Sequence, residues 1–157
     1  MGYYSEFYPN FKKQGNSLQT NFTDVVKLKD QFKENVNSLL SDLINEFFRV
    51  DKPIATIGYG TLMLFHAFNK DAWLFNKYNL TGMPISEECR EVHFLHLPFL
   101  IEESVRELNG NFISEKNLNQ SFVTIDKHLI CGQNDSSLMI VLNNFCFFIN
   151  KGFLYNV

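Results

Sequence analysis

A short run without charged residues, ending at two closely spaced glycines, constrains the fold of this 157-residue chain more than any other feature. The run from Ile54 to Ile57 lacks the regular polar alternation of a half-exposed strand, as expected of a parallel strand covered on both faces. Gly58 and Gly60 mark a tight turn after it, and the residues from Thr61 to Phe68 are predicted to form a helix. Strand, turn and helix in this order indicate an α/β sheet.

The flanking segments continue this alternation. Apolar residues at helical spacing predict a helix from Val36 to Phe48, which ends before Pro53 because proline disfavours helix at the residue preceding it. Downstream we expect a strand over 73–80, helices over 85–92, 98–108 and 137–149, and strands over 121–125 and 129–131. Residues 1–35 show no clear periodicity, and we predict that they form a poorly ordered or non-homologous lead-in to a domain over 36–157.

Composition narrows the classes of function. The net charge of −3 argues against a nucleic-acid partner, which would need a basic face. The longest apolar stretch, 138–149, is too short to span a bilayer, and no signal peptide is visible. Three scattered cysteines without a CxxC pair favour a reduced compartment and argue against a disulfide framework or a zinc site. The cytoplasm is the default location, with secretion or an endosomal location left open.

Four separate blocks, in order and at matching spacing, carry a resemblance to a known family. They are the strand, Gly-x-Gly turn and helix at 54–68 and the segments 78–82, 97–103 and 126–137. Together they resemble the ThiJ/PfpI branch of the class I glutamine amidotransferase-like superfamily. The resemblance implies an α/β fold, a three-layer flavodoxin-like sandwich with a mostly parallel sheet. Residues 1–35 do not supply the strands that the family places upstream, so we expect the N-terminal strands of the domain to be missing and the isolated chain to be marginally stable or oligomeric.

The resemblance also places the family's chemistry on the glycine turn. Active members hold a nucleophilic cysteine between strand and helix, followed by a histidine and a glycine; these positions fall on Gly58, Tyr59 and Gly60. The turn is therefore predicted to be a vestigial nucleophile elbow without thiol or imidazole. Glycine adopts the strained backbone of an elbow at little cost, so the turn can persist after the reaction is lost. The backbone N–H of Tyr59 could still bind an anion or a carbonyl oxygen.

Other interpretations of the turn are weaker. A phosphate-binding Walker loop needs Gly-x-x-x-x-Gly-Lys-Ser/Thr, and a dinucleotide-binding turn needs a third glycine. The sequence around Gly58 has neither pattern. We expect no cofactor and no metal; a His93/His96 metal pair is conceivable, but no third ligand suggests itself.

Several residues outside the turn remain candidates. Cys131 is either a displaced nucleophile or, as we favour, a buried packing residue. Glu102 matches a family position near the rim of the site, and Gln133 and Asn134 lie in a loop near it. The pairs at 87–88 and 102–103 are interpreted as acidic residues that begin helices, where the helix dipole favours them. We assign ligand binding to Gly58, Tyr59, Glu102, Gln133 and Asn134.

These observations favour a pseudoenzyme. The chain is predicted to be a catalytically inactive amidotransferase-like domain that binds a small anionic or carbonyl ligand or a protein partner, with a homodimer as one possibility. The alternative is a glyoxalase, deglycase or small-amide hydrolase of the ThiJ/PfpI type that uses a displaced nucleophile. Turnover that depends on Cys131 would favour the alternative.

Overall fold

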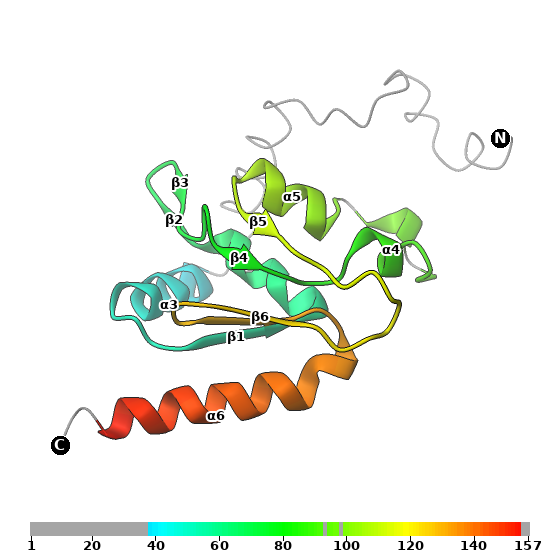
Figure 1. The fold of residues 1–157 in the computed structure, drawn as a ribbon. Coiled ribbons are helices and arrows are strands. Elements are labelled where there is room, and N and C mark those ends of the chain that lie inside the picture. The colour runs from blue at the N-terminus through cyan, green and yellow to red at the C-terminus, as the bar shows by residue number, and fades with distance from the viewer. Residues whose placement is uncertain (1–37, 93, 98, 155–157) are drawn as a thin grey trace, which may run out of the picture.

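The computed structural model describes residues 38–92, 94–97 and 99–154. Both the predicted lead-in over 1–35 and His93 therefore lie outside the described residues. Figure 1 shows a mixed α/β fold whose elements are, in chain order, α3 (Ser38–Arg49), β1 (Ile54–Ile57), η2 (Gly58–His66), β2 (Phe68–Asn69), β3 (Ala72–Trp73), β4 (Asn79–Leu80), α4 (Ile85–Glu88), η3 (Phe94–His96), α5 (Ile101–Glu107), β5 (Asn111–Phe112), β6 (Val123–Asp126), β7 (Leu129–Gly132), η4 (Asp135–Ser137) and α6 (Leu138–Leu154).

A three-stranded sheet in the order β1-β7-β6 forms the centre. β1 runs parallel to β7, with Ile54 opposite Leu129 and Ile57 opposite Gly132, whereas β6 returns antiparallel to β7. The helix α6 lies along one face of the sheet, and η2 packs on it from the other side (Figure 1). No helix within the described ranges is long and apolar enough to cross a membrane.

Two short strand pairs extend this centre. β2 and β3 form an antiparallel hairpin, and β4 pairs in parallel with β5. β4 lies against β6, where the backbone N–H of Asn79 donates a hydrogen bond of 2.8 Å to the Asp126 carboxylate. The β4–β5 pair therefore covers the β6 side of the central sheet.

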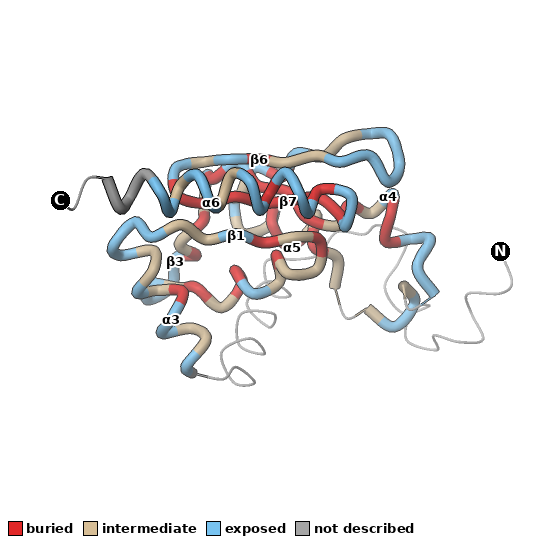
Figure 2. The backbone as a smooth tube through the Cα atoms, turned by 90° about the horizontal axis from the view of Figure 1, so that it is seen from below, coloured by how far each residue is buried: buried red, intermediate tan, exposed pale blue. Residues whose placement is uncertain are grey.

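The core is built from aromatic side chains, in keeping with 17 phenylalanines in the sequence. Phe65 and Phe75 are fully buried, and the ring of Phe48 packs edge-on against Phe75 at 5.3 Å between centroids. The indole N–H of Trp73 donates to the carbonyl of Leu64 at 2.7 Å, which satisfies its only polar atom inside the core. Figure 2 shows the buried segments gathered in the centre of the molecule, with exposed residues on the outer side of α6.

The elements with strong periodicity are confirmed. These are the strand over 54–57, the hairpin formed by 121–125 and 129–131, and the closing helix that begins near 137. The helix predicted over 36–48 is confirmed from Ser38 onward as α3, and residues 36 and 37 lie outside the described residues.

Four predicted elements need correction. The predicted helix over 61–68 is a 3₁₀-helix that begins at Gly58 and ends at His66, and Phe68 already belongs to β2. A continuous strand over 73–80 is wrong because a turn interrupts it, with the Asn76 amide on the Trp73 carbonyl and Lys77 at φ 64°.

The predicted helices over 85–92 and 98–108 were too long. α4 ends at Glu88, after which the backbone N–H groups of Arg90 and Glu91 bond three residues back in tighter turns. α5 begins at Ile101 because Leu100 still has extended backbone angles.

Candidate functional site

Gly58 is the first residue after the central strand β1, and its backbone is left-handed. Its φ is +52°; it follows Ile57, which is extended, and is the first residue of η2. L-residues with a side chain rarely adopt this conformation, and glycine does so at little cost. The strand, the left-handed residue and the following helical segment together have the backbone form of the predicted elbow.

Space is available for a side chain at Gly58. A Cβ atom built there would lie 3.7 Å from the Gln133 carbonyl oxygen and 3.8 Å from the Met83 methyl carbon, which are ordinary contacts. At Gly60 a Cβ would meet no heavy atom within 4 Å. The elbow therefore lacks a side chain although the surrounding residues leave room for one.

Gly82 behaves in the opposite way. A Cβ there would lie 2.9 Å from the Thr61 hydroxyl oxygen and 3.2 Å from the Gly58 carbonyl oxygen. The absence of a side chain at Gly82 lets the segment after β4 approach the elbow closely. The Thr61 hydroxyl bonds the Thr81 carbonyl at 3.1 Å and joins the same two segments.

Tyr59 is the residue after Gly58, and the charge of Glu88 acts on its side chain. Burial raises the pKa of the half-buried Tyr59, and the nearby carboxylates of Glu88 and Glu91 raise it further. Tyr59 therefore keeps its proton near neutral pH and is a poor general base.

Glu88 is the most unusual ionisable group near the elbow. Its side chain is completely buried, and neither carboxyl oxygen has a hydrogen-bond partner among the described residues. Burial raises its pKa to about 7, and the charges of Glu102 and Glu103 add to this increase. The backbone N–H of Ile101 acts in the opposite direction, although its geometry is not that of a hydrogen bond. Glu88 thus holds a proton at the interface of α4 and α5 at mildly acidic pH.

Gln133 and Asn134 bond a different carboxylate. The Gln133 amide donates to Glu87 at 2.7 Å, and the Asn134 amide donates to both Glu87 oxygens at 3.0 and 3.1 Å. The backbone N–H of Asn119 adds a further bond of 3.1 Å to Glu87. The side-chain amides predicted to bind a ligand thus hold a buried carboxylate, and Gln133 contributes only its backbone carbonyl next to Gly58.

Cys131 lies in the interior of the sheet. It has no exposed surface, and burial raises its pKa to about 11, although hydrogen bonds from neighbouring groups act in the opposite direction. The Thr56 hydroxyl donates to its sulfur at 3.2 Å. A thiol in this setting is neither accessible nor ionised near neutral pH.

Glu102 joins α5 to α4. One carboxylate oxygen accepts the Ile85 N–H at 3.2 Å, and the other pairs with Arg106 at 2.7 Å. The charge of Glu102 helps to raise the pKa of Glu88, which is compatible with its predicted position near the rim of the site. In the described part of the chain no group of three metal-ligating side chains is close enough to hold a metal ion.

The structure thus places the Gln133 carbonyl next to Gly58, and the charge of Glu88 acts on the Tyr59 side chain. The side chains of Asn134 and Cys131 belong to other clusters. Sequence reasoning missed Glu88, since Glu87 and Glu88 were treated as one acidic pair. Successive side chains on a helix point about 100° apart. Two adjacent glutamates on a helix therefore cannot share one environment, and this was the signal that could have separated Glu88 from Glu87.

The geometry first defines a class: an α/β protein whose parallel strand ends in an elbow of the kind that carries nucleophiles. Two solved structures share this fold. One is the Rapid Encystment Protein 24 kDa of Francisella tularensis, with a TM-score of 0.66 and 20% identity over 90% of this chain and 68% of that chain. The other is a crystal structure with a TM-score of 0.69 and 25% identity over 73% of this chain and 52% of that chain. Their fold is of the flavodoxin-like ThiJ/PfpI type.

Relatives then identify the lineage. Glutamine amidotransferase-like class 1 domain-containing protein 1 of Xenopus laevis is 34% identical over 112 residues, which are 71% of this chain and 48% of the relative. The protein of the same name from Homo sapiens is 34% identical over 109 residues, which are 69% of this chain and 49% of the relative. No protein-family model matches the chain. The predicted resemblance is confirmed: the chain is a homologue of these glutamine amidotransferase-like proteins and spans about half their length.

Proposed function

We propose that this chain is a catalytically inactive amidotransferase-like domain that binds a small anionic or carbonyl ligand, or a protein partner, at the elbow. Gly58 carries the proposal. It has the left-handed backbone of an elbow and space for a side chain, but no group that can attack a substrate. The backbone is kept where the superfamily holds its nucleophile, while the nucleophile is absent.

Binding is proposed to centre on the backbone at the start of η2. The N–H of Tyr59 follows the left-handed Gly58 and is one of the backbone N–H groups in the first turn of a nine-residue 3₁₀-helix. Such groups favour an anion or a carbonyl oxygen. Of the other predicted ligand residues, Gln133 has its backbone carbonyl next to Gly58 and Glu102 accepts the Ile85 N–H, whereas the side-chain amides of Gln133 and Asn134 donate to Glu87.

The competing function is an enzyme that uses a displaced nucleophile. Cys131 would have to be that nucleophile, but it is fully buried and its pKa is raised to about 11. Nucleophilic cysteines have lowered pKa values and some exposure. The surroundings of Cys131 therefore favour a packing role.

Turnover and binding can be tested separately. The purified chain and its Cys131→Ser variant are incubated with methylglyoxal and a panel of small amides, and product is followed by NMR. We expect neither to exceed the buffer control. Turnover by the native chain that Cys131→Ser abolishes would overturn the proposal.

Binding is measured by titrating acetate and pyruvate into the ¹⁵N-labelled chain. We expect the Tyr59 amide resonance to shift saturably. A Gly58→Cys variant should bind the ligands more weakly, because its side chain narrows the site. Gly60→Cys is the matched control and should bind like the native chain, because a Cβ at Gly60 meets nothing within 4 Å. No saturable shift near the elbow for any small ligand would remove the small-ligand part of the proposal and leave only a protein partner.

A further inference from the structure

The segment between β5 and β6 passes beside α4 on one side of the molecule (Figure 1). We call its residues 115–120 the strap. They form neither a helix nor a strand, and none of them is buried. The one apolar residue among them, Leu118, is 37% exposed. Apolar packing therefore contributes little to holding the strap in place.

Hydrogen bonds tie both ends of the strap to buried side chains. The backbone N–H of Glu115 donates to Gln133 Oε1 at 2.8 Å. The backbone N–H of Asn119 donates to Glu87 Oε1 at 3.1 Å, and the Asn134 side-chain amide donates to the carbonyl of the last strap residue at 3.1 Å. Water can replace each of these partners when the strap opens, so each bond contributes only modest net stability.

Further hydrogen bonds lie within the strap. Glu115 Oε1 accepts the backbone N–H groups of Lys116 and Asn117 at 2.8 and 3.2 Å. The Asn117 side-chain amide donates to Gln120 Oε1 at 3.0 Å. These bonds connect the two ends of the strap, so we expect it to move as one unit.

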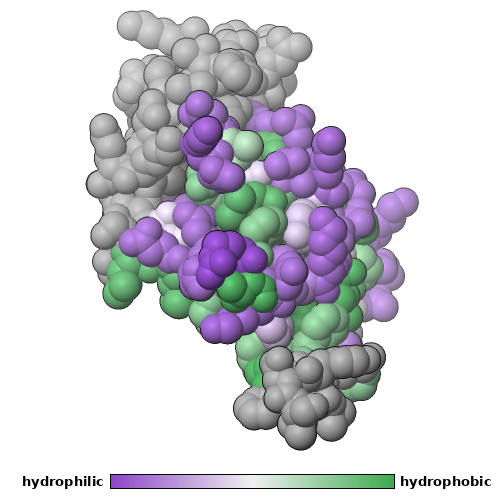
Figure 3. All heavy atoms as spheres, turned by 90° about the vertical axis from the view of Figure 1, so that its left-hand side faces the viewer, coloured by the Kyte–Doolittle hydropathy of each residue, from purple (hydrophilic) through white to green (hydrophobic). Residues whose placement is uncertain are grey.

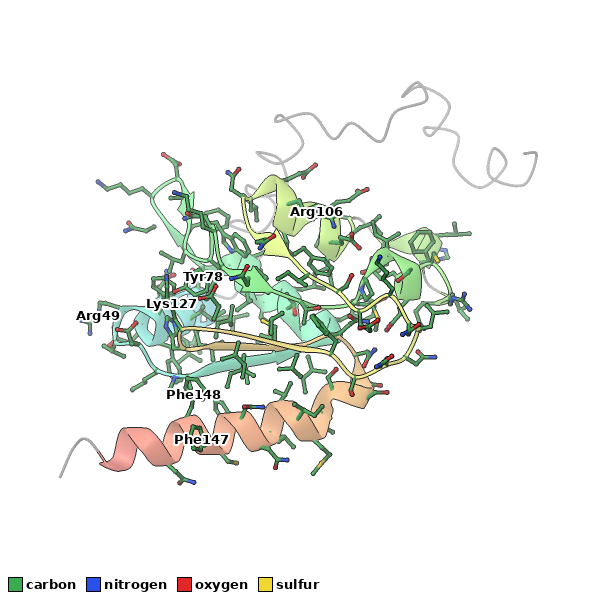
Figure 4. The ribbon with its side chains drawn as sticks, viewed as in Figure 1. Arg49, Tyr78, Arg106, Lys127, Phe147 and Phe148 are labelled. Atoms are coloured by element: carbon green, nitrogen blue, oxygen red, sulfur yellow. The ribbon has the colours of Figure 1, made fainter. Side chains whose placement is uncertain are left out.

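The turn between β6 and β7, at the other end of β6, is held differently. The Lys127 ammonium lies 4.2 Å from the centroid of the Tyr78 ring, and Figure 4 shows these two side chains at the same end of the sheet. The buried ring of His128 packs against Phe48 at 5.2 Å between centroids. Figure 3 views this end of the molecule and shows hydrophobic residues among hydrophilic ones. The strap has no aromatic residue, and segments with few apolar contacts open most easily.

The strap covers polar groups that adjoin the elbow. Beneath it the side-chain amides of Gln133 and Asn134 donate to Glu87 at 2.7 and 3.0 Å. Opening breaks the bonds that these three side chains make to the strap and leaves the bonds among them in place. The backbone carbonyl oxygen of Gln133 lies beside Gly58, so the uncovered groups are next to the elbow.

We propose that the strap is a lid that opens as one unit and gives small polar molecules in solution access to the side-chain amides of Gln133 and Asn134. In the closed form these amides bond Glu87 and the strap. In the open form they can be reached from solution beside the elbow. A part for the lid in ligand entry rests on the proposed function, whereas the opening itself does not.

The test is hydrogen exchange of the full chain, measured by NMR without ligand and expressed as protection factors that correct for intrinsic exchange rates. The backbone amides of Glu115 and Asn119 should have protection factors that agree within roughly threefold and lie at least roughly a hundredfold below those of the most protected amides of β7. The side-chain amide protons of Gln133 and Asn134 should exchange together with the strap amides and not with β7.

Glu115→Ala loosens the strap without changing Glu87, because it removes the acceptor of the Lys116 and Asn117 N–H groups. We expect the protection of the Asn119 amide and of the two side-chain amides to fall roughly tenfold, while that of β7 is unchanged. Lys116→Ala, an exposed position on the strap, is the matched control and should leave these protection factors as they are in the native chain.

A second variant tests the strap from its other end. Glu87→Gln weakens the anchor of Asn119, and the Glu115 amide should also lose protection although it bonds Gln133 and not Glu87. Strap amides that exchange only together with β7 would overturn the proposal. A loss of protection in Glu115→Ala that is confined to Lys116 and Asn117 would overturn it as well. If the strap opens as expected and no ligand binds at the elbow, the proposed function fails and the lid stands.

Discussion

Glu87 and Glu88 are neighbours on the short helix α4, both are buried, and their surroundings are opposite. Glu87 accepts hydrogen bonds from Gln133, Asn134 and Asn119 and joins three segments of the chain. Glu88 has no hydrogen-bond partner among the described residues and has a pKa raised to about 7. A satisfied buried carboxylate stabilises a fold, whereas an unsatisfied one costs stability. The Glu87 cluster therefore stabilises the fold, whereas Glu88, beside the elbow, lowers its stability.

The largest expected effect is on the Glu87 cluster. Glu87→Ala removes the acceptor of three donors and leaves the buried amides of Gln133 and Asn134 without it, so we expect a loss of about 3 kcal/mol in the free energy of unfolding. Urea denaturation followed by circular dichroism measures it. Glu87→Gln, which keeps one acceptor oxygen, should lose less. If Glu87→Ala cost no more than an exposed substitution, the distinction between the two carboxylates would be lost.

Glu88 should instead make stability depend on pH. Its pKa is raised from 4.5 to about 7, so between these values the unfolded chain loses the proton while the folded chain keeps it. The stability contributed by the protonated carboxyl is therefore complete below about pH 4.5 and is lost as the pH rises through about 7. Each pKa unit corresponds to about 1.4 kcal/mol, and allowing for solvent screening we expect a loss on the order of 2 kcal/mol.

Glu88→Gln checks this dependence because the amide does not titrate. Unfolding free energies of the native chain and the variant are compared at pH 5 and pH 8, and the variant should gain relative to the native chain at pH 8. Burial lowers the pKa of His128, which costs stability on acidification, but both proteins share this effect. Glu91→Gln, an exposed position on the same turn, is the matched control. Equal pH slopes for the native chain and Glu88→Gln would show that Glu88 is ionised like an ordinary surface residue.

At the elbow the comparison predicts a backbone effect. Gly58→Ala forces a side chain into a left-handed conformation and should cost about 1–2 kcal/mol, although the space is free. Gly60→Ala has no positive φ and no close neighbour, so its cost should be smaller. Thermal unfolding of both variants measures the difference. An equal cost at the two glycines would contradict a strained elbow at Gly58.

The sequence predicted the elbow because its signals are local: an uncharged strand, two glycines and a helical pattern. It also predicted α3 and the β6–β7 hairpin, whose periodicity extends over several residues. The two-residue strands β2 to β5 could not be predicted, because two residues show no alternation and their pairing depends on distant segments. The division of labour between Glu87 and Glu88 was hidden for the same reason, since Gln133 and Asn134 reach Glu87 from more than forty residues away along the chain.

The smallest effect is expected from Glu102. It pairs with Arg106, whose side chain is 56% exposed, so Glu102→Gln should cost only about 0.5 kcal/mol. It should also lower the pKa of Glu88, because the charge of Glu102 is one of the causes that raise it. A double-mutant cycle with Glu88→Gln isolates this coupling: the stability gap between pH 5 and pH 8 should shrink in Glu102→Gln and stay unchanged when Glu102→Gln is added to Glu88→Gln. If the gap shrank equally in both backgrounds, Glu102 would affect stability without acting through Glu88. The contact of α4 with α5 would then not control the protonation of Glu88.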